Sequence, residues 1–81
     1  MRVHVLFFGM VKDLVGRAEE ELELPPGADG EALFAHYAAA SPKLAALGGS
    51  ILLARNREFT PRGAPLADGD EVALLPPVSG G

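Results

Sequence analysis

The sequence predicts a small α+β domain in which a mixed β-sheet is covered on one face by one main helix. Three observations lead to this prediction. The most apolar strand candidates are the first and the last, one helix candidate lies between two pairs of strand candidates, and the 81 residues show neither an internal repeat nor a second domain. Since cysteine is absent, neither a disulfide nor a zinc–thiolate site can support the fold, and burial of apolar side chains has to stabilise it.

The first half of the chain predicts a strand, a short helix and a second strand. Arg2–Phe8 is apolar on both faces toward its end, which is typical of a central strand. Residues 10–16 (MVKDLVG) offer one or two helical turns that end at Gly16. Ala18–Leu24 alternates leucine with glutamate, which predicts an edge strand with one face in water.

The second half predicts the main helix and the remaining strands. Asp29 is suited to cap a helix over Gly30–Ala40, and Pro42 begins a further short turn, Lys43–Leu47. Asn56 suits a tight turn between two strands. The predicted strands are Ile51–Arg55, a brief return strand around Glu58–Thr60, and Glu71–Leu75.

This order of elements predicts the β-grasp (ubiquitin-like) arrangement, with the first and last strands side by side at the centre of the sheet. If these strands are parallel, the long path between them supplies the required crossover. We expect residues 1–75 to form the β-grasp domain and residues 76–81 to form an extended, functional C-terminal tail. The net charge of -4 and the scattered lysine and arginine residues argue against nucleic-acid binding. No apolar stretch approaches a membrane span and no signal-peptide pattern is present, so we expect a cytoplasmic protein with no membrane partner.

Little catalytic chemistry is indicated. His4 and His36 make a poor metal set without cysteine, and structural roles are favoured for both. Glu19, Glu21 and Glu23 are spaced as the solvated face of a strand, and the serines lack the context of an activated nucleophile. We therefore expect no metal, and no catalytic activity from this chain alone.

The tail "PPVSGG" is the most informative segment. Pro76 and Pro77 donate no backbone N–H and hold an extended course. Gly80 and Gly81 lack a Cβ and can enter a slot too narrow for other residues. A carboxylate at the end of such a tail is ionised and resists attack, so a partner has to activate it, most plausibly as an acyl-adenylate, before it accepts sulfur or an amine.

The stretches "PLADGDEVALLPPVSGG" and "VHVLFFGMVKDLVG" closely resemble the small subunits of molybdopterin synthase (molybdopterin-converting factor subunit 1), which are ubiquitin-like sulfur carriers. The motif "DGDEVA" with a Gly-Gly end is shared with other sulfur carriers, whereas "PPVSGG" together with "LFF" is more specific. The resemblance covers essentially the whole chain.

The resemblance implies that an activating enzyme adenylates Gly81 with ATP and that the product becomes a thiocarboxylate. The tail, with Gly80 as the steric companion of Gly81, then inserts into the large subunit, expected as a heterotetramer, where the sulfur passes to a precursor pterin in molybdenum cofactor biosynthesis. This chain itself is expected to bind no cofactor.

A docking surface is also expected. If the helix covers one face of the sheet, the alternation of the strands places Leu6 and Phe8 with Ala73 and Leu75 on the other face, and Phe59 is a candidate to join them. The resemblance implies partner binding by Phe8, Phe59, Leu75, Pro76, Pro77 and Val78. The alternative is that loops or the small helix cover these side chains.

Three other functions stay open. The first is a sulfur carrier for thiamine thiazole or transfer-RNA thiolation, which uses the same terminal chemistry with another acceptor. The second is a ubiquitin-like modifier that forms an isopeptide bond with a lysine. The third is a β-grasp binding module with an inert tail.

Overall fold

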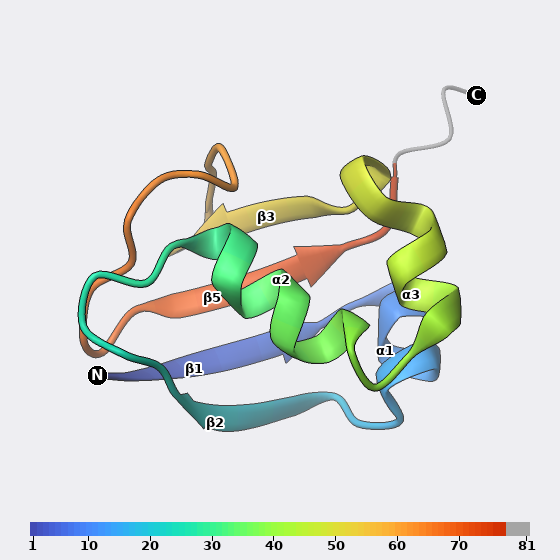
Figure 1. The fold of residues 1–81 in the computed structure, drawn as a ribbon, viewed down its shortest axis with the longest axis horizontal. Helices are drawn as coiled ribbons and strands as arrows, with labels where there is room; N and C mark the ends of the chain where they lie inside the picture. Colours follow the sequence, from blue (N-terminus) through green and yellow to red (C-terminus); the bar gives the residue numbers. More distant parts are fainter. Residues whose placement is uncertain (78–81) are drawn as a thin grey trace.

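The computed structural model describes residues 1–77. It shows a five-stranded mixed sheet with the strand order β2-β1-β5-β3-β4, and with helices packed on one face (Figure 1). The strands are β1 (Arg2–Phe7), β2 (Glu19–Glu23), β3 (Leu52–Arg55), β4 (Glu58–Phe59) and β5 (Glu71–Leu75). The helices are α1 (Gly9–Val15), α2 (Gly30–Ala38) and α3 (Pro42–Leu47), followed by a 3-10 turn, η1 (Gly48–Ser50).

The two most apolar strands lie side by side at the centre of the sheet, as predicted, and they are parallel. β1 pairs with β5 from His4 opposite Glu71 to Phe7 opposite Leu74. β2 pairs antiparallel with β1 and forms one edge, while β3 pairs antiparallel with β5 and carries β4 at the other edge. The β-grasp fold is thereby confirmed.

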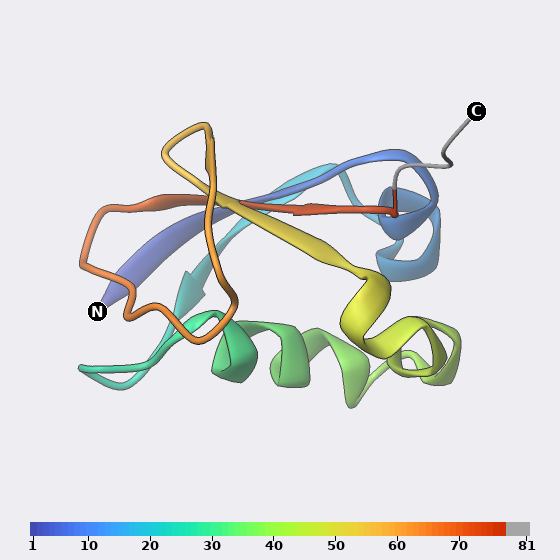
Figure 2. The same ribbon diagram turned by 90° about the horizontal axis from the view of Figure 1, so that it is seen from above.

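The helices α2 and α3 form a layer against one face of the sheet. Figure 2 shows α2 and α3 on one side of it, while the yellow-to-orange hairpin after β3 rises on the opposite side. The Asp29 carboxylate accepts a hydrogen bond from the Ala32 N–H at 2.9 Å, so the predicted cap is confirmed. α2 ends at Ala38 rather than Ala40, because Pro42 requires an extended residue before it and Ser41 adopts that conformation.

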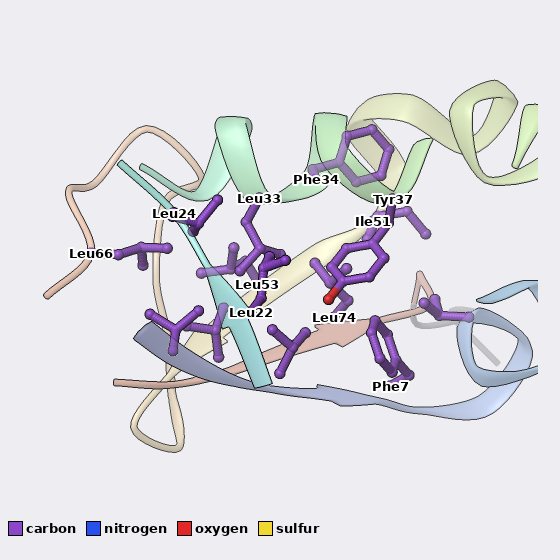
Figure 3. Packing of buried hydrophobic residues seen from close by; sticks show 14 of the residues in the cluster. Phe7, Leu22, Leu24, Leu33, Phe34, Tyr37, Ile51, Leu53, Leu66 and Leu74 are labelled. Atoms are coloured by element: carbon purple, nitrogen blue, oxygen red, sulfur yellow. The ribbon is translucent and has the colours of Figure 1, made fainter. Parts of the chain in front are cut away.

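The core lies between the sheet and this helical layer. From β1, Val3 and Val5 are fully buried and Phe7 is nearly so, which confirms the predicted core face of that strand. The rings of Phe7 and Tyr37 pack edge to face with centroids 4.9 Å apart (Figure 3). The rest of the cluster is apolar and comes from every large element: Val11, Leu22, Leu24, Leu33, Phe34, Leu44, Ile51, Leu53, Leu66, Val72 and Leu74.

A tight turn joins β3 to β4. Asn56 and Arg57 both have positive φ, of 51° and 71°, as a two-residue hairpin turn requires. The Asn56 side chain donates to Asp70 at 3.0 Å, and the Ala67 N–H donates to the same carboxylate at 2.8 Å. Burial acts to raise the pKa of Asp70, but these hydrogen bonds and the nearby Arg55 hold it below its ordinary value. The turn is thus fixed to the loop that precedes β5.

α1 is short and lies at the end of the sheet where β1 and β5 finish (Figure 1). It ends at Gly16, whose φ of 88° is left-handed, as predicted from the sequence. Within residues 1–77, no helix has the length and apolar character needed to cross a membrane.

Candidate functional site: an apolar pocket on the uncovered face of the sheet

The face of the sheet opposite the helices carries a pocket of about 220 Å³. Strand alternation places the apolar side chains there, since the neighbouring residues of β1 and β5 fill the core. We call this the docking pocket. Its lining comes from β1, the residue after it, β3, the hairpin and β5: Leu6, Phe8, Ala54, Arg57, Phe59, Glu71, Ala73 and Leu75.

The predicted docking residues Phe8, Phe59 and Leu75 therefore meet in one pocket. Phe8 remains 46% exposed and Phe59 72% exposed, so neither is covered by loops or by α1. Large aromatic side chains in an apolar hollow at the surface are a common feature of protein interfaces. The surface is thus open to a partner.

The sequence did not place three members of this lining. Ala54 and Arg57 belong to the β3–β4 hairpin, and Glu71 begins β5. The pairing of β3 with β5, which the strand pattern did not predict, places Ala54 and Arg57 there, whereas Glu71 follows from the same alternation along β5 as Ala73 and Leu75. Alternation along β3, together with the pairing of Ala54 opposite Ala73, would have placed Ala54 on this face.

A row of charged groups lies along one side of the docking pocket. The His4 imidazole Nδ1 is 2.8 Å from Glu21 Oε1, and its Nε2 is 3.6 Å from Glu19. The hydrogen bond with Glu21, reinforced by Glu19 and Glu71, raises the pKa of His4 above its ordinary value. Glu71 in turn lies 3.8 Å from the Arg57 guanidinium. The uncovered face is thus apolar near the C-terminal ends of β1 and β5. It is charged along β2 and nearer the starts of these two strands.

The end of β5 is held next to the start of α1. The Phe8 N–H donates to the Leu74 carbonyl at 3.2 Å. Gly9 has a φ of 53°, and a Cβ there would lie 3.0 Å from Cγ of Pro76, so the backbone and the proline ring are in close contact. The chain therefore leaves the sheet, through Pro76 and Pro77, beside the docking pocket. The predicted functional residues Val78, Gly80 and Gly81 lie outside the described residues.

A second cavity, of about 190 Å³, lies on the helical side between α1, β2 and α2. Inside it the Tyr37 hydroxyl donates to Glu20, which also pairs with Arg17. Burial and the Glu20 carboxylate raise the pKa of Tyr37. Burial opposes ionisation of Glu20, but Tyr37 and Arg17 hold the pKa of this carboxyl below its ordinary value. These groups satisfy one another and fix α2 to β2.

The two histidines have structural surroundings in the described part of the chain. His4 pairs with glutamates at the surface, and the His36 ring packs edge to face on Tyr37 with centroids 4.8 Å apart. Among residues 1–77, no group of three histidine, aspartate or glutamate side chains is arranged to hold a metal ion. Within residues 1–77, the apolar pocket on the uncovered face is therefore a better candidate for a functional site than the histidines.

Comparisons with known proteins agree with this geometry. The ThiS family profile matches residues 5–81. The chain is 43% identical to the molybdopterin synthase sulfur carrier subunit of Escherichia coli (strain K12), over 98% of this chain and 99% of that protein. It is 40% identical to the subunit of the same name in Chlamydomonas reinhardtii, over the full length of both.

Solved structures with the same fold are similar over nearly their whole length. A putative molybdopterin converting factor, subunit 1, from Pyrococcus furiosus superposes with a TM-score of 0.83 at 29% identity, covering 96% of this chain and 99% of that one. A complex of subunits 1 and 2 of the molybdopterin-converting factor from Helicobacter pylori 26695 contains a chain that matches with a TM-score of 0.66 at 30% identity, over the whole of both chains. Small archaeal modifier protein 1 of Haloferax volcanii matches with a TM-score of 0.78 at 28% identity, covering 95% and 98%. The chain therefore belongs to the ThiS family and, within it, to the molybdopterin synthase sulfur carrier subunits.

Proposed function

We propose that this chain carries sulfur as the small subunit of molybdopterin synthase, with Gly81 as the residue that bears it. The observation that supports this most strongly is the docking pocket, which lies beside the point where Pro76 leads the chain out of the sheet toward Gly80 and Gly81. The pocket would bind the partner and thereby deliver the tail to a site on that partner.

The chemistry at Gly81 needs two steps before sulfur can leave. In the first, a carboxylate oxygen attacks the α-phosphorus of ATP, which gives the acyl-adenylate and releases pyrophosphate. In the second, sulfide-level sulfur (HS⁻) attacks the acyl carbon and AMP leaves, so that a thiocarboxylate remains. We assign both steps to an activating enzyme. The active-site groups that act on the pterin, which accepts the sulfur, are assigned to the large subunit.

The partner proposed for the docking pocket is the large subunit of molybdopterin synthase. A subunit 1 from Helicobacter pylori, which this chain resembles, has been solved in complex with its subunit 2. By analogy we propose a heterotetramer of two small and two large subunits, located in the cytoplasm and recharged by the activating enzyme after each transfer.

Two variants of the tail test this function. Deletion of Gly81, or addition of one alanine after it, is expected to abolish sulfur transfer to the pterin while the free energy of unfolding stays unchanged, because neither change touches residues 1–77. The variant Ser79→Ala serves as the matched control in the tail and is expected to keep its sulfur-transfer activity. Pterin sulfuration by either Gly81 variant would contradict the proposal.

One competing function has a specific observation behind it. The similarity to small archaeal modifier protein 1 makes a ubiquitin-like modifier the second candidate. In that case the activated Gly81 would form an isopeptide bond with lysines of other proteins. Mass spectrometry of cell extracts distinguishes the two: branched peptides that carry the tail of this chain on lysine indicate a modifier, and a thiocarboxylate without such adducts indicates the carrier. A carrier for another acceptor, such as a thiazole or transfer RNA, would be recognised by its failure to bind the large subunit.

A further inference from the structure

A second apolar pocket lies on the other side of Phe59 from the docking pocket. It has a volume of about 430 Å³ and lies at the β4 edge of the sheet. We call it the edge pocket, and its lining is Leu52, Leu53, Phe59, Thr60 and Pro61. Phe59 is the residue that lines both pockets, and it is 72% exposed; we call it the Phe59 ridge.

The hairpin that carries this ridge is held in place by its own hydrogen bonds. The Thr60 N–H donates to the Leu53 carbonyl at 3.0 Å, and the Thr60 hydroxyl donates to the Glu58 carbonyl at 2.9 Å. The backbone N–H and the hydroxyl of Thr60 are therefore both bonded within the hairpin, which fixes this lining residue in place. The edge pocket is built from fixed elements, so little conformational entropy is lost when a partner fills it.

The docking pocket alone is too small for a stable interface. Stable interfaces bury about 800 Å² on each partner, which is about one sixth of the 4658 Å² surface of this chain. The contact surface must therefore extend beyond the docking pocket. Toward β2 the uncovered face is charged, with His4, Glu19 and Glu21 exposed or half-buried. Past Phe59 it is apolar, and burial of apolar surface is the more favourable direction.

We infer that the partner straddles the Phe59 ridge, and that it places one apolar side chain in the docking pocket and a second in the edge pocket. The partner is the large subunit, so this inference rests on the proposed function. Since the edge pocket offers no charged lining residue, the group that it takes is an aliphatic or aromatic side chain. Phe59 then loses solvent on both faces of its ring, as the central residues of interfaces do.

Substitutions confined to the edge pocket test the inference. Pro61→Glu puts a charge at an exposed lining residue, and Leu52→Ala removes apolar surface from a half-buried one. Pro26→Glu is the matched control, because it makes the same substitution at another exposed proline, in the loop between β2 and α2. The affinity of each full-length variant for the large subunit is measured by calorimetry, and its unfolding midpoint by circular dichroism.

We expect Pro61→Glu to weaken binding at least about tenfold and Leu52→Ala about fivefold, with wild-type binding by Pro26→Glu. Methyl NMR with selectively labelled leucines gives an independent readout: the signals of the half-buried Leu52 methyl groups, which line the edge pocket, should shift when the large subunit binds. Unchanged affinity in Pro61→Glu together with unshifted Leu52 methyl groups would overturn the inference while leaving the docking pocket in place. Failure of the proposed function looks different, since the unsubstituted chain itself would then not bind the large subunit, and both proposals would fall.

Discussion

Phe59→Ala should separate binding from folding. The side chain of a phenylalanine offers about 200 Å² of surface, and because Phe59 is 72% exposed, about 140 Å² of it is available to a partner. At about 25 cal/mol for each Å² of apolar surface, full burial of that area is worth about 3.5 kcal/mol. Alanine retains a part of the contact, so we expect the loss of binding free energy to be about 3 kcal/mol, or about a hundredfold in Kd.

The same substitution should cost little stability. The small buried part of Phe59 contributes about 1 kcal/mol to folding by the same area estimate. Phe7→Ala is the matched control, since Phe7 is only 2% exposed and packs on Tyr37. We expect that core substitution to cost about 3–5 kcal/mol of unfolding free energy. The two phenylalanines should therefore affect different measurements.

The assay combines calorimetric titration of the large subunit with urea unfolding of the free chain. For Phe59→Ala we expect a Kd raised about a hundredfold and a free energy of unfolding lowered by only about 1 kcal/mol. A Kd within about threefold of the wild-type value would refute the reasoning, because it would mean that Phe59 stays in water in the complex. A loss of stability as large as that of Phe7→Ala would refute it as well, since the ring would then belong to the core.

Three further predictions follow from contacts elsewhere in the fold. Gly30→Ala should lower the free energy of unfolding by about 1–3 kcal/mol in urea titrations, because a Cβ at Gly30 would lie 2.6 Å from the Arg62 carbonyl oxygen; wild-type stability would show that the contact relaxes freely. The pKa of Asp70 is depressed, so its contribution to stability is present above the ordinary aspartate pKa and is lost as the pH falls through the folded value. In acid unfolding series Asp70→Asn should lack this part of the pH dependence, and an unaltered profile would contradict the assignment. The pKa of His4 is raised, so its contribution to stability is present below the ordinary value of 6.5 and is lost as the pH rises through the folded value. Glu21→Gln should therefore lower the pKa of the His4 ring in an NMR titration. An unchanged titration would rule out the hydrogen bond with Glu21 as the cause of the raised pKa.

Local patterns were sufficient to predict most of the fold. The bounds of β5 agree with the predicted strand, because an Asp-Gly turn precedes an apolar run that ends at two prolines. Val3 and Val5 were assigned to the core by a period of two, which is a property of the strand itself. Asp29 was recognisable as a cap from its position before the apolar stripe of α2. Each of these signals lies within a few residues of the feature that it predicts.

Contacts between distant segments could not be predicted in the same way. The Tyr37–Glu20 hydrogen bond joins α2 to β2, and neither residue has a local pattern that indicates the other. The uncovered face was predicted for Phe8 and Leu75 from alternation, but the shape of the docking pocket also depends on the β3–β4 hairpin. That hairpin is placed by the pairing of β3 with β5, a choice among several strand orders that the sequence pattern left open.

The most direct test of the central claim is the intact mass of the protein, isolated under mild conditions from the cells that make it. If this chain carries sulfur, a species is found in which one oxygen is replaced by sulfur, with fragment ions that place the sulfur at the carboxyl group of Gly81. This species then disappears when the purified protein is incubated with the large subunit and the precursor pterin. If only the free carboxylate is found, even after incubation with ATP, a sulfur donor and cell extract, the claim that this chain carries sulfur is contradicted.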